Sequence, residues 1–179
     1  LTLWVALTGL LHLDGLADSA DAWLGGFGDR ERTLQIMKDP RSGPVAVVVL
    51  VLLLLLKFSA LLALLQAQQY SALLLAPVLG RAALPALFLC TPYVRPGGLG
   101  HALAANLPHG GARGVLALVA VGCLLFGSSG LIALSLAAVT FLLARRAMLR
   151  RLGGTTGDTA GALLELVECT VLIGLALQL

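Results

Sequence analysis

The sequence is poor in charged residues. Only 12% of its 179 residues are Asp, Glu, Lys or Arg, against about 25% in soluble domains, whereas 59% are hydrophobic. So few charges cannot cover a water-exposed surface of this size, which excludes a soluble globular fold. We therefore expect an integral membrane protein whose main environment is the lipid bilayer.

Aromatic residues and cysteines are also scarce. Aromatics make up 5% of the chain, the net charge is only +3, and no basic patch alternates with aromatic side chains, so we expect no nucleic-acid partner. Cys90, Cys123 and Cys169 lie singly in apolar runs, without the paired spacing of a zinc site or a disulfide framework. We interpret them as small buried apolar residues.

Long apolar runs dominate what remains, and a helix needs about 20 mostly apolar residues to cross a membrane. Three runs have this length: residues 44–65, 71–91 and 160–179. Residues 114–126 and 131–144 are shorter runs on either side of the Gly-Ser-Ser-Gly sequence at 127–130, which is typical of a turn. We predict a tight hairpin of two short spans there, with one long tilted helix as the alternative.

The first apolar run, residues 1–11, is too short to cross a bilayer core of about 30 Å at about 1.5 Å per residue. No basic segment precedes it, as one would in a signal peptide. We expect that the chain begins inside a helix and is truncated at its N-terminus. Together the runs predict an all-α fold, a polytopic transmembrane helical bundle of about five to six spans that forms one catalytic domain over residues 1–179.

Three polar stretches separate the apolar runs, at residues 12–43, 93–113 and 145–159. If the spans alternate in direction, all three stretches lie on the same side of the membrane. They contain ten of the twelve Lys and Arg residues, namely Arg30, Arg32, Lys38, Arg41, Arg95, Arg113, Arg145, Arg146, Arg150 and Arg151. The positive-inside rule makes this side cytoplasmic. A single helix over residues 114–144 would put four of these arginines outside, which argues against that alternative.

The richest polar segment is His12-Leu-Asp14-Gly-Leu-Ala-Asp18-Ser-Ala-Asp21. On a helix, Asp14, Asp18 and Asp21 fall within about 60° of one another. Like charges at this spacing repel, and more strongly beside a bilayer, where the effective dielectric is lower. Carboxylates are the hard oxygen ligands that Mg²⁺ takes in proteins, together with substrate phosphates. The pattern predicts a magnesium site, with a solvated acidic face as the alternative.

A second acidic cluster follows the segment Gly153-Gly-Thr-Thr-Gly157-Asp158. If a helix begins near Asp158, then Asp158, Glu165 and Glu168 lie within roughly 80° on one face. An N-cap role would explain Asp158 alone. The two glutamates inside an apolar helix should face the bundle interior, where they are further candidate metal ligands. The segment lacks the Gly-Lys-Ser/Thr ending of a P-loop, which excludes a Walker-type nucleotide site.

Several cations are candidates for binding phosphate, because Arg can hold phosphate oxygens bidentately. Arg32, Lys38 and Arg41 follow the first acidic cluster closely. Flanking charge under the positive-inside rule explains Arg30 and Arg32 equally well, whereas Lys38 and Arg41 adjoin the start of a span. Lys57 and Arg81 lie about ten residues or more inside apolar runs, where a charge costs roughly 2.5–3.5 kcal/mol. They either pair with carboxylates in the membrane or line a polar pocket that opens to the cytoplasm.

The sequence resembles the cobalamin synthase family, the adenosylcobinamide-GDP ribazoletransferases. The resemblance is carried, in the family's order, by the segment from His12 to Asp21, Arg32 with Ile36-Met-Lys38-Asp-Pro-Arg41-Ser-Gly43, Gly80-Arg81, Tyr93-Val-Arg95-Pro-Gly-Gly-Leu-Gly100, and the segment from Gly153 to Glu168. The blocks cover nearly the whole chain. Pro40 and Pro44 stand where many family members carry other small residues.

The resemblance implies the reaction and its setting. The adenosylcobinamide-phosphate group would pass from adenosylcobinamide-GDP to α-ribazole or its 5′-phosphate, with release of GMP and with Mg²⁺ as cofactor, at the cytoplasmic face of a bacterial inner membrane. Such a transfer depends on charge neutralisation and in-line positioning more than on covalent catalysis.

The resemblance also suggests roles for the candidate residues. The metal would be held by Asp14, Asp18, Asp21, Glu165 and Glu168, and Asp18 or Asp158 would accept the proton of the attacking hydroxyl. Phosphate oxygens would be bound by Arg32, Lys38, Arg41, Arg81 and Arg95.

Two other classes of protein are alternatives. CDP-alcohol phosphotransferases also use aspartates and metal at a membrane surface, but their pattern has Arg after an Ala where this sequence has Asp18. A secondary transporter would hold its coupling charges near the bilayer midplane, whereas seven of the nine acids here lie in the polar stretches.

Overall fold

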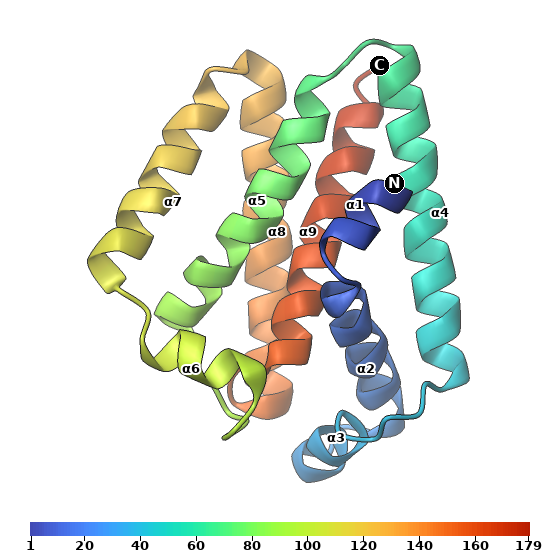
Figure 1. Ribbon diagram of the computed structural model, residues 1–179, viewed down its shortest axis with the longest axis vertical. Helices are drawn as coiled ribbons and strands as arrows, with labels where there is room; N and C mark the ends of the chain where they lie inside the picture. The colour runs from blue at the N-terminus through green and yellow to red at the C-terminus, as the bar shows by residue number, and fades with distance from the viewer.

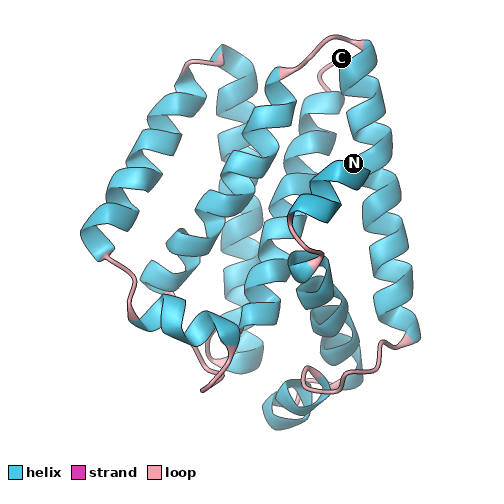
Figure 2. Cartoon of the chain, viewed as in Figure 1, coloured by secondary structure: helices cyan, strands magenta, loops and turns pink.

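The computed structural model describes residues 1–179, apart from the side chain of residue 99, and these residues form an all-helical chain (Figure 1, Figure 2). The helices are α1 (Thr2–Leu7), α2 (Leu11–Gly25), α3 (Arg30–Ile36), α4 (Pro44–Gln66), α5 (Ser71–Cys90), α6 (Leu99–Ala105), α7 (His109–Leu124), α8 (Gly127–Leu152) and α9 (Gly157–Ala176). The only strand-like pairing among the described residues is an isolated bridge between Tyr93 and Thr155. The predicted all-α class is confirmed.

Helix α9 is the centre of the bundle. It packs against α2, α4, α5 and α8, and Figure 1 shows it enclosed by these helices. Thirteen of its twenty residues are buried, which is expected of a helix that is surrounded by others rather than lying at a surface. Its Leu163, Val167 and Leu172 join Leu64 of α4 and Leu87 of α5 in the largest apolar core.

Four helices, α4, α5, α8 and α9, are long and apolar enough to cross a membrane, and α7 is a shorter apolar helix. Helix α4 exposes a row of large apolar side chains, which suits contact with lipid rather than water. The row consists of Val47, Val48, Val51, Leu52, Leu55 and Leu56. The chain is therefore a multi-pass helical membrane bundle, as the apolar runs predicted.

Helices α7 and α8 form the predicted hairpin, and the alternative of one helix over residues 114–144 is wrong. The turn lies at residues 125–126, just ahead of the Gly-Ser-Ser-Gly sequence, which forms the first turn of α8 instead.

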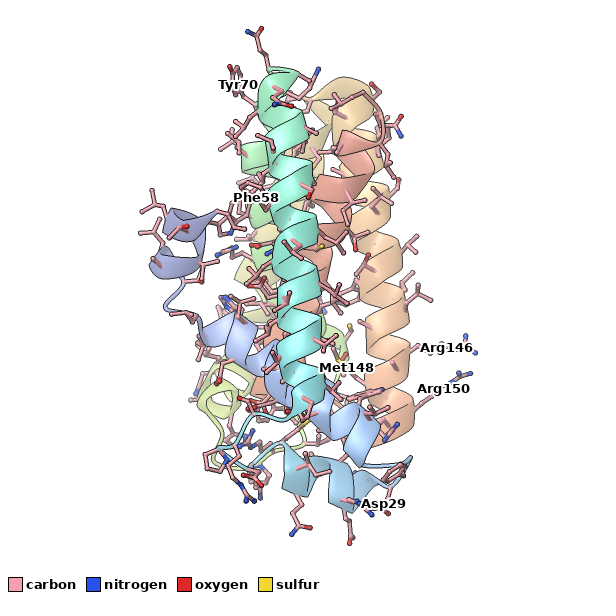
Figure 3. The ribbon with its side chains drawn as sticks, turned by 90° about the vertical axis from the view of Figure 1, so that its right-hand side faces the viewer. Asp29, Phe58, Tyr70, Arg146, Met148 and Arg150 are labelled. Atoms are coloured by element: carbon pink, nitrogen blue, oxygen red, sulfur yellow. The ribbon has the colours of Figure 1, made fainter. Side chains whose placement is uncertain are left out.

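Helix α8 continues through residues 145–152, which belong to the third polar stretch of the sequence. Arg, Leu and Met are strong helix formers, and the added turns are amphipathic. Met148 is buried, whereas Arg146 and Arg150 project away from the bundle (Figure 3). The basic residues that ended the apolar pattern therefore extend the helix beyond its apolar part and do not end it.

The two ends of the bundle differ in polarity. One end carries the α4–α5 loop, the α7–α8 turn and the C-terminus, and the other carries α3, α6 and the α8–α9 loop (Figure 1). Tyr70 and Asp29 mark these opposite ends (Figure 3). The three polar stretches therefore converge at one end, as expected for spans that alternate in direction.

Candidate functional site

Helix α2 packs closely against the first turns of α9. A Cβ at Gly15 would lie 2.7 Å from the carbonyl oxygen of Asp158, and a Cβ at Gly161 would lie 3.2 Å from the Cα of His12. Glycine at both contacts lets the two backbones approach where a side chain would hold them apart. The acidic segment of α2, beginning at Asp14, consequently lies beside the N-terminal turn of α9.

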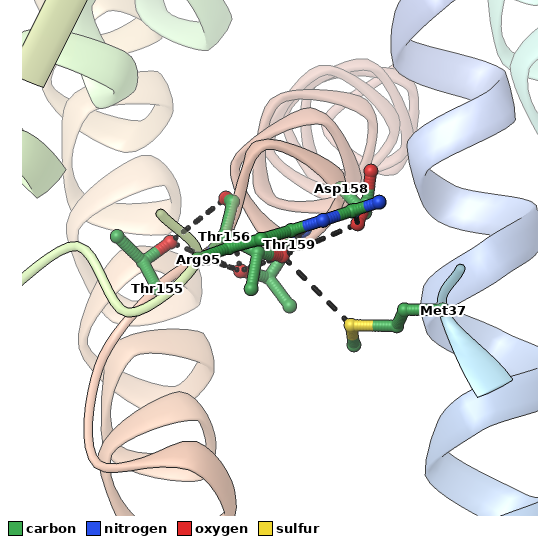
Figure 4. Close-up of polar contacts among 6 residues, drawn as sticks. All are labelled: Met37, Arg95, Thr155, Thr156, Asp158 and Thr159. Carbon is green, nitrogen blue, oxygen red and sulfur yellow. Dashed lines mark hydrogen bonds and ion pairs between the residues drawn. The ribbon is translucent and has the colours of Figure 1, made fainter. Parts of the chain in front are cut away.

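A short parallel pairing between two loops positions Arg95. The Val94 N–H donates to the Thr155 carbonyl at 2.9 Å, and the Thr155 N–H donates to the Pro92 carbonyl at 2.8 Å. This pairing ties the loop after α5 to the loop before α9. The Arg95 guanidinium then donates to the carboxylate of Asp158 (Figure 4).

The start of α9 is fixed by a capping box between two threonines. The Thr156 hydroxyl accepts from the Thr159 N–H at 3.2 Å, and the Thr159 hydroxyl accepts from the Thr156 N–H at 2.9 Å (Figure 4). Thr156 is therefore the N-cap, and the N-cap interpretation of Asp158 is wrong. Asp158 lies in the first turn instead, where the helix dipole favours a negative charge.

Asp18 lies in strongly negative surroundings. Partial burial raises the pKa of its carboxyl group to about 6, with further contributions from the charges of Asp14, one turn earlier, and Asp158, across the helix contact. Arg95 acts in the opposite direction but does not cancel them. A carboxylate in this position is stabilised by any cation that binds beside it.

A pocket of about 400 Å³ opens next to these acids, between α2, α9 and the loop after α5. This volume is within the roughly 300–1,000 Å³ of pockets that hold small molecules. Several glycines of the three segments form part of its wall. Its charged and aromatic lining residues are Asp14, Arg95, Asp158, His12, Phe88 and Tyr93.

Comparison with known proteins assigns the chain to a family. Residues 1–176 match the cobalamin-5-phosphate synthase family. The chain belongs to this family. It is 83% identical to an adenosylcobinamide-GDP ribazoletransferase of Stutzerimonas stutzeri and 70% identical to one of Pseudomonas fluorescens, in each case over 99% of this chain and 73% of the relative. No solved structure matches the chain significantly.

The family assignment decides between the classes left open by the sequence. Cobalamin-5-phosphate synthases are enzymes, so the match argues against a transporter. The two relatives carry a ribazoletransferase name rather than a CDP-alcohol phosphotransferase name. The predicted resemblance is confirmed over nearly the whole chain.

The carboxylate of Asp21 is bound by the start of α4. The carboxylate accepts from the Gly43 N–H at 2.5 Å and from the Ala46 N–H at 2.9 Å. These are two of the N–H groups that the first turn of a helix leaves without internal partners. Asp21 therefore fixes the loop from α3 to α4, on the same helix as Asp14 and Asp18 but with its oxygens directed to another element.

Glu165 and Glu168 form ion pairs with Lys57 and Arg81 in the apolar part of the bundle. Lys57 Nζ donates to Glu165 at 2.6 Å and to Glu168 at 2.7 Å, and Arg81 donates to the other oxygen of Glu168. Lys57, Glu165 and Glu168 are all buried. Of the two interpretations of Lys57 and Arg81, the structure shows pairing with intramembrane carboxylates. Two positive and two negative charges balance in this network, which we call the buried ion network.

The remaining phosphate-binding candidates lie at the polar end, outside the pocket. Arg41 pairs with Asp39 at 2.7 Å, and its side chain is 86% exposed. The hydrogen bond from Arg41 lowers the pKa of Asp39 to about 2. Arg32 lies over the ring of Phe27, 5.0 Å from its centroid, and Lys38 is exposed. Arg95 is the only one of the five predicted phosphate-binding residues that lines the pocket.

The five acids predicted to be metal ligands are thus divided among three places. Asp14 and Asp18 lie at the α2–α9 contact, Asp21 binds the start of α4, and the two glutamates belong to the buried ion network. Among the described residues, no group of three or more His, Cys, Asp or Glu side chains is arranged to hold a metal ion by itself. A metal at the α2–α9 contact would therefore need oxygen ligands from a substrate.

The sequence analysis assigned no role to His12 or Tyr93, although both stand in the blocks that carry the resemblance. Each has a buried polar atom without a hydrogen-bond partner among the described residues, Nδ1 of His12 and the hydroxyl of Tyr93. Burial, then the charge of Arg81, lowers the pKa of His12, so its ring is neutral at neutral pH. The position of Tyr93, an aromatic residue in a glycine-rich loop, is the sequence feature that could have marked it as a candidate.

Proposed function

We propose that this chain transfers the adenosylcobinamide-phosphate group from adenosylcobinamide-GDP to the nucleoside α-ribazole or its 5′-phosphate, with Mg²⁺ as cofactor. The names of its relatives support this assignment. The observation that carries it is the close α2–α9 contact at Gly15, where Asp14, Asp158 and Arg95 line one pocket. Asp18 lies near enough for the charge of Asp158 to raise its pKa. Charged groups of both signs at one place suit a reaction at a pyrophosphate.

The reaction exchanges the phosphoanhydride bond of the donor for a phosphodiester bond to the nucleoside. A hydroxyl oxygen of the nucleoside attacks the phosphorus that is attached to the cobinamide, a new P–O bond forms, and the P–O bond to the leaving GMP breaks. The hydroxyl proton passes to a base on the protein, and GMP leaves with the electron pair of the broken bond.

Asp14 and Asp18 fit a magnesium ion better than the other acids do. Burial, followed by the charges of Asp14 and Asp158, raises the pKa of Asp18, so a cation bound beside it would stabilise the ionised carboxylate. Mg²⁺ typically takes one or two carboxylates and completes its coordination with water and substrate phosphates. When bound there, Mg²⁺ would neutralise charge on the pyrophosphate and on the leaving GMP. Asp21, Glu165 and Glu168 are left out of this site, because backbone N–H groups or cations already bind their oxygens.

Asp158 is the proposed proton acceptor. It lines the pocket, whereas Asp18 does not, and a carboxylate that binds a metal is a weak base. The hydrogen bond from Arg95 holds the Asp158 side chain in place. Arg95 also carries the positive charge nearest the proposed reaction centre, where it can bind a phosphate oxygen of the donor.

Arg32, Lys38 and Arg41 are proposed to bind the guanosine diphosphate part of the donor. They lie on α3 and on the loop that follows it, at the same end of the bundle as Asp14 and Asp18. Arg81 is assigned to the buried ion network instead. The concentration of Lys and Arg at this end supports a site on the cytoplasmic face of the inner membrane, because the positive-inside rule favours these residues on that side.

Turnover by the protein in liposomes tests the proposal. With adenosylcobinamide-GDP, α-ribazole and Mg²⁺, we expect GMP release that requires all three components and stops when EDTA is added. Asp158→Asn should lower the rate by about 10²–10⁴-fold, the usual contribution of a general base. Glu31→Gln is the matched control, because Glu31 is an exposed acid at the same end of the bundle.

Three outcomes would contradict the proposal. They are GMP release that is unchanged by EDTA, an Asp158→Asn variant as active as the control, and transfer from CDP-alcohols in place of adenosylcobinamide-GDP.

A further inference from the structure

The pocket beside Asp158 has an aromatic side. The rings of Phe88 and Tyr93 meet edge to face with centroids 6.2 Å apart, and the ring of His101 lies 5.8 Å from that of Tyr93. Phe88 and Tyr93 both line the pocket. With their planes inclined at 62°, the two aromatic rings offer a flat and an edge-on surface to a planar ligand.

The Tyr93 ring is held in place by glycine backbone. Its hydroxyl oxygen would lie 2.6 Å from a Cβ at Gly98 and 3.6 Å from a Cβ at Gly157, and a Cβ at Gly100 would also contact the ring. A side chain at Gly98 or Gly100 would displace the tyrosine, whereas the 3.6 Å separation at Gly157 is ordinary van der Waals contact. The glycine loop thus packs closely around the Tyr93 side chain. The Tyr93 hydroxyl group nevertheless has no hydrogen-bond partner among the described residues.

Two buried polar atoms without partners at one pocket are unusual. A buried donor or acceptor that is left unpaired carries a desolvation penalty, and native structures contain few of them. Tyr93 and His12 both line this pocket. A ligand with one or two hydrogen-bonding groups on an otherwise apolar, planar body would remove the penalty at both residues.

We propose that this pocket binds the base and ribose of the acceptor nucleoside, with the base against Phe88 and Tyr93 and the ribose directed toward Asp158. The inference rests on the proposed function and adds to it the place of one of the two substrates. The benzimidazole base of α-ribazole is planar and uncharged, and it has a single free ring nitrogen, which accepts a hydrogen bond from the Tyr93 hydroxyl. A ribose hydroxyl then pairs with His12.

The size and charge of the pocket distinguish the acceptor from the donor. At about 400 Å³ it lies at the lower end of small-molecule pockets, large enough for a nucleoside and far too small for a corrinoid. The guanosine diphosphate part of the donor carries several negative charges, whereas two of the three charged lining residues are acids, Asp14 and Asp158. An uncharged base is the better match.

Equilibrium binding of α-ribazole to the detergent-solubilised protein, measured by calorimetry, tests the inference without requiring turnover. Tyr93→Phe removes only the hydroxyl group and should weaken α-ribazole binding about 5- to 10-fold. Binding of adenosylcobinamide-GDP should stay within twofold. Tyr70→Phe is the matched control, since it removes the same group from an exposed tyrosine at the opposite end of the bundle.

Steady-state turnover provides the second readout. Tyr93→Phe should raise the KM for α-ribazole by a similar factor and leave kcat and the KM for adenosylcobinamide-GDP nearly unchanged. A wild-type protein that binds α-ribazole through Tyr93 but releases no GMP would refute the proposed function and support the pocket assignment. Unchanged α-ribazole binding in Tyr93→Phe, or a loss confined to adenosylcobinamide-GDP, would overturn the assignment.

Discussion

Gly15 of α2 lies against the backbone of Asp158, where a Cβ would come within 2.7 Å of the Asp158 carbonyl oxygen. This contact joins the two acidic segments of the chain, which are separated by more than half of the sequence. Asp14 and Asp18 are on one side of it, and Asp158 with its partner Arg95 is on the other. The proposed reaction centre therefore depends on a glycine that takes no part in the chemistry.

Replacement of Gly15 should separate the two halves of the site. In Gly15→Val the side chain would meet backbone atoms, which cannot move aside as a flexible side chain can, so α2 must shift away from α9. A misplacement of about 1 Å can lower an enzymatic rate roughly 100-fold, and we expect at least this loss of GMP release. Gly122→Ala is the control, because no atom lies within 4 Å of a Cβ at Gly122. Equal activity of the two variants would disprove the role of the contact.

The buried ion network should stabilise the fold only as a balanced set. Lys57→Met leaves two buried glutamates with Arg81 alone, and removal of one member of a buried pair typically destabilises by about 3–5 kcal/mol. The double variant Lys57→Met/Glu165→Gln restores neutrality and should recover much of this loss. Thermal unfolding in detergent measures the effect, with the exposed Lys38→Met as control. Additive effects of the two substitutions would show that the charges do not interact.

Asp21 should prove to be a structural residue rather than a metal ligand. Asp21→Ala removes the acceptor of two N–H groups at the start of α4, and loss of such a cap typically costs about 0.5–2 kcal/mol. We expect a lower unfolding temperature together with unchanged affinity for Mg²⁺ in the turnover assay. A large rise in the Mg²⁺ concentration required for activity would instead show that Asp21 is a metal ligand.

Because the pKa of Asp18 is elevated, we expect the free energy of unfolding to depend on pH. The folded pKa of about 6 exceeds the ordinary 3.8, so between these values the folded state binds more protons than the unfolded state. Without metal, the free energy of unfolding should therefore fall as pH rises from about 4 to 6. Mg²⁺ requires the ionised carboxylate, so its stabilising effect should be present at pH 7.5 and lost near pH 5.

Asp18→Asn supplies the control for this pH dependence. Thermal unfolding of the metal-free variant should vary less between pH 4 and 6 than that of the wild type, and Mg²⁺ should stabilise it little at any pH. An identical pH profile in the variant and the wild type would assign the titration to another group.

Much of the fold follows from local patterns in the sequence. Apolar runs gave the positions of α4, α5 and α9, because a membrane helix must be long and apolar throughout. The spacing of Asp14 and Asp18 placed both on one helical face, and the position of Lys57 inside an apolar run indicated either a carboxylate partner or a polar pocket. Each of these inferences depends only on residues that are close together in the chain.

The parts that could not be predicted depend on contacts between distant segments. The backbone pairing of Val94 with Thr155 brings Arg95 to Asp158. No periodic pattern in the sequence predicts this pairing. Asp21 looked equivalent to Asp14 and Asp18 on the helix, but the path of the chain after α3 brings the start of α4 to it. Residues 145–152 appeared to end an apolar span, although their basic side chains extend the same helix.

The central claim is that a divalent cation binds at Asp14 and Asp18, beside the start of α9, and not among the intramembrane glutamates. Mn²⁺ can replace Mg²⁺ and is detected by electron paramagnetic resonance. Its binding to the protein can therefore be titrated in the presence of adenosylcobinamide-GDP. We expect Asp18→Asn to weaken Mn²⁺ binding by at least about 10-fold, and Glu165→Gln and the control Glu31→Gln to leave it unchanged. Full Mn²⁺ affinity in Asp18→Asn, with binding lost in Glu165→Gln, would contradict the account.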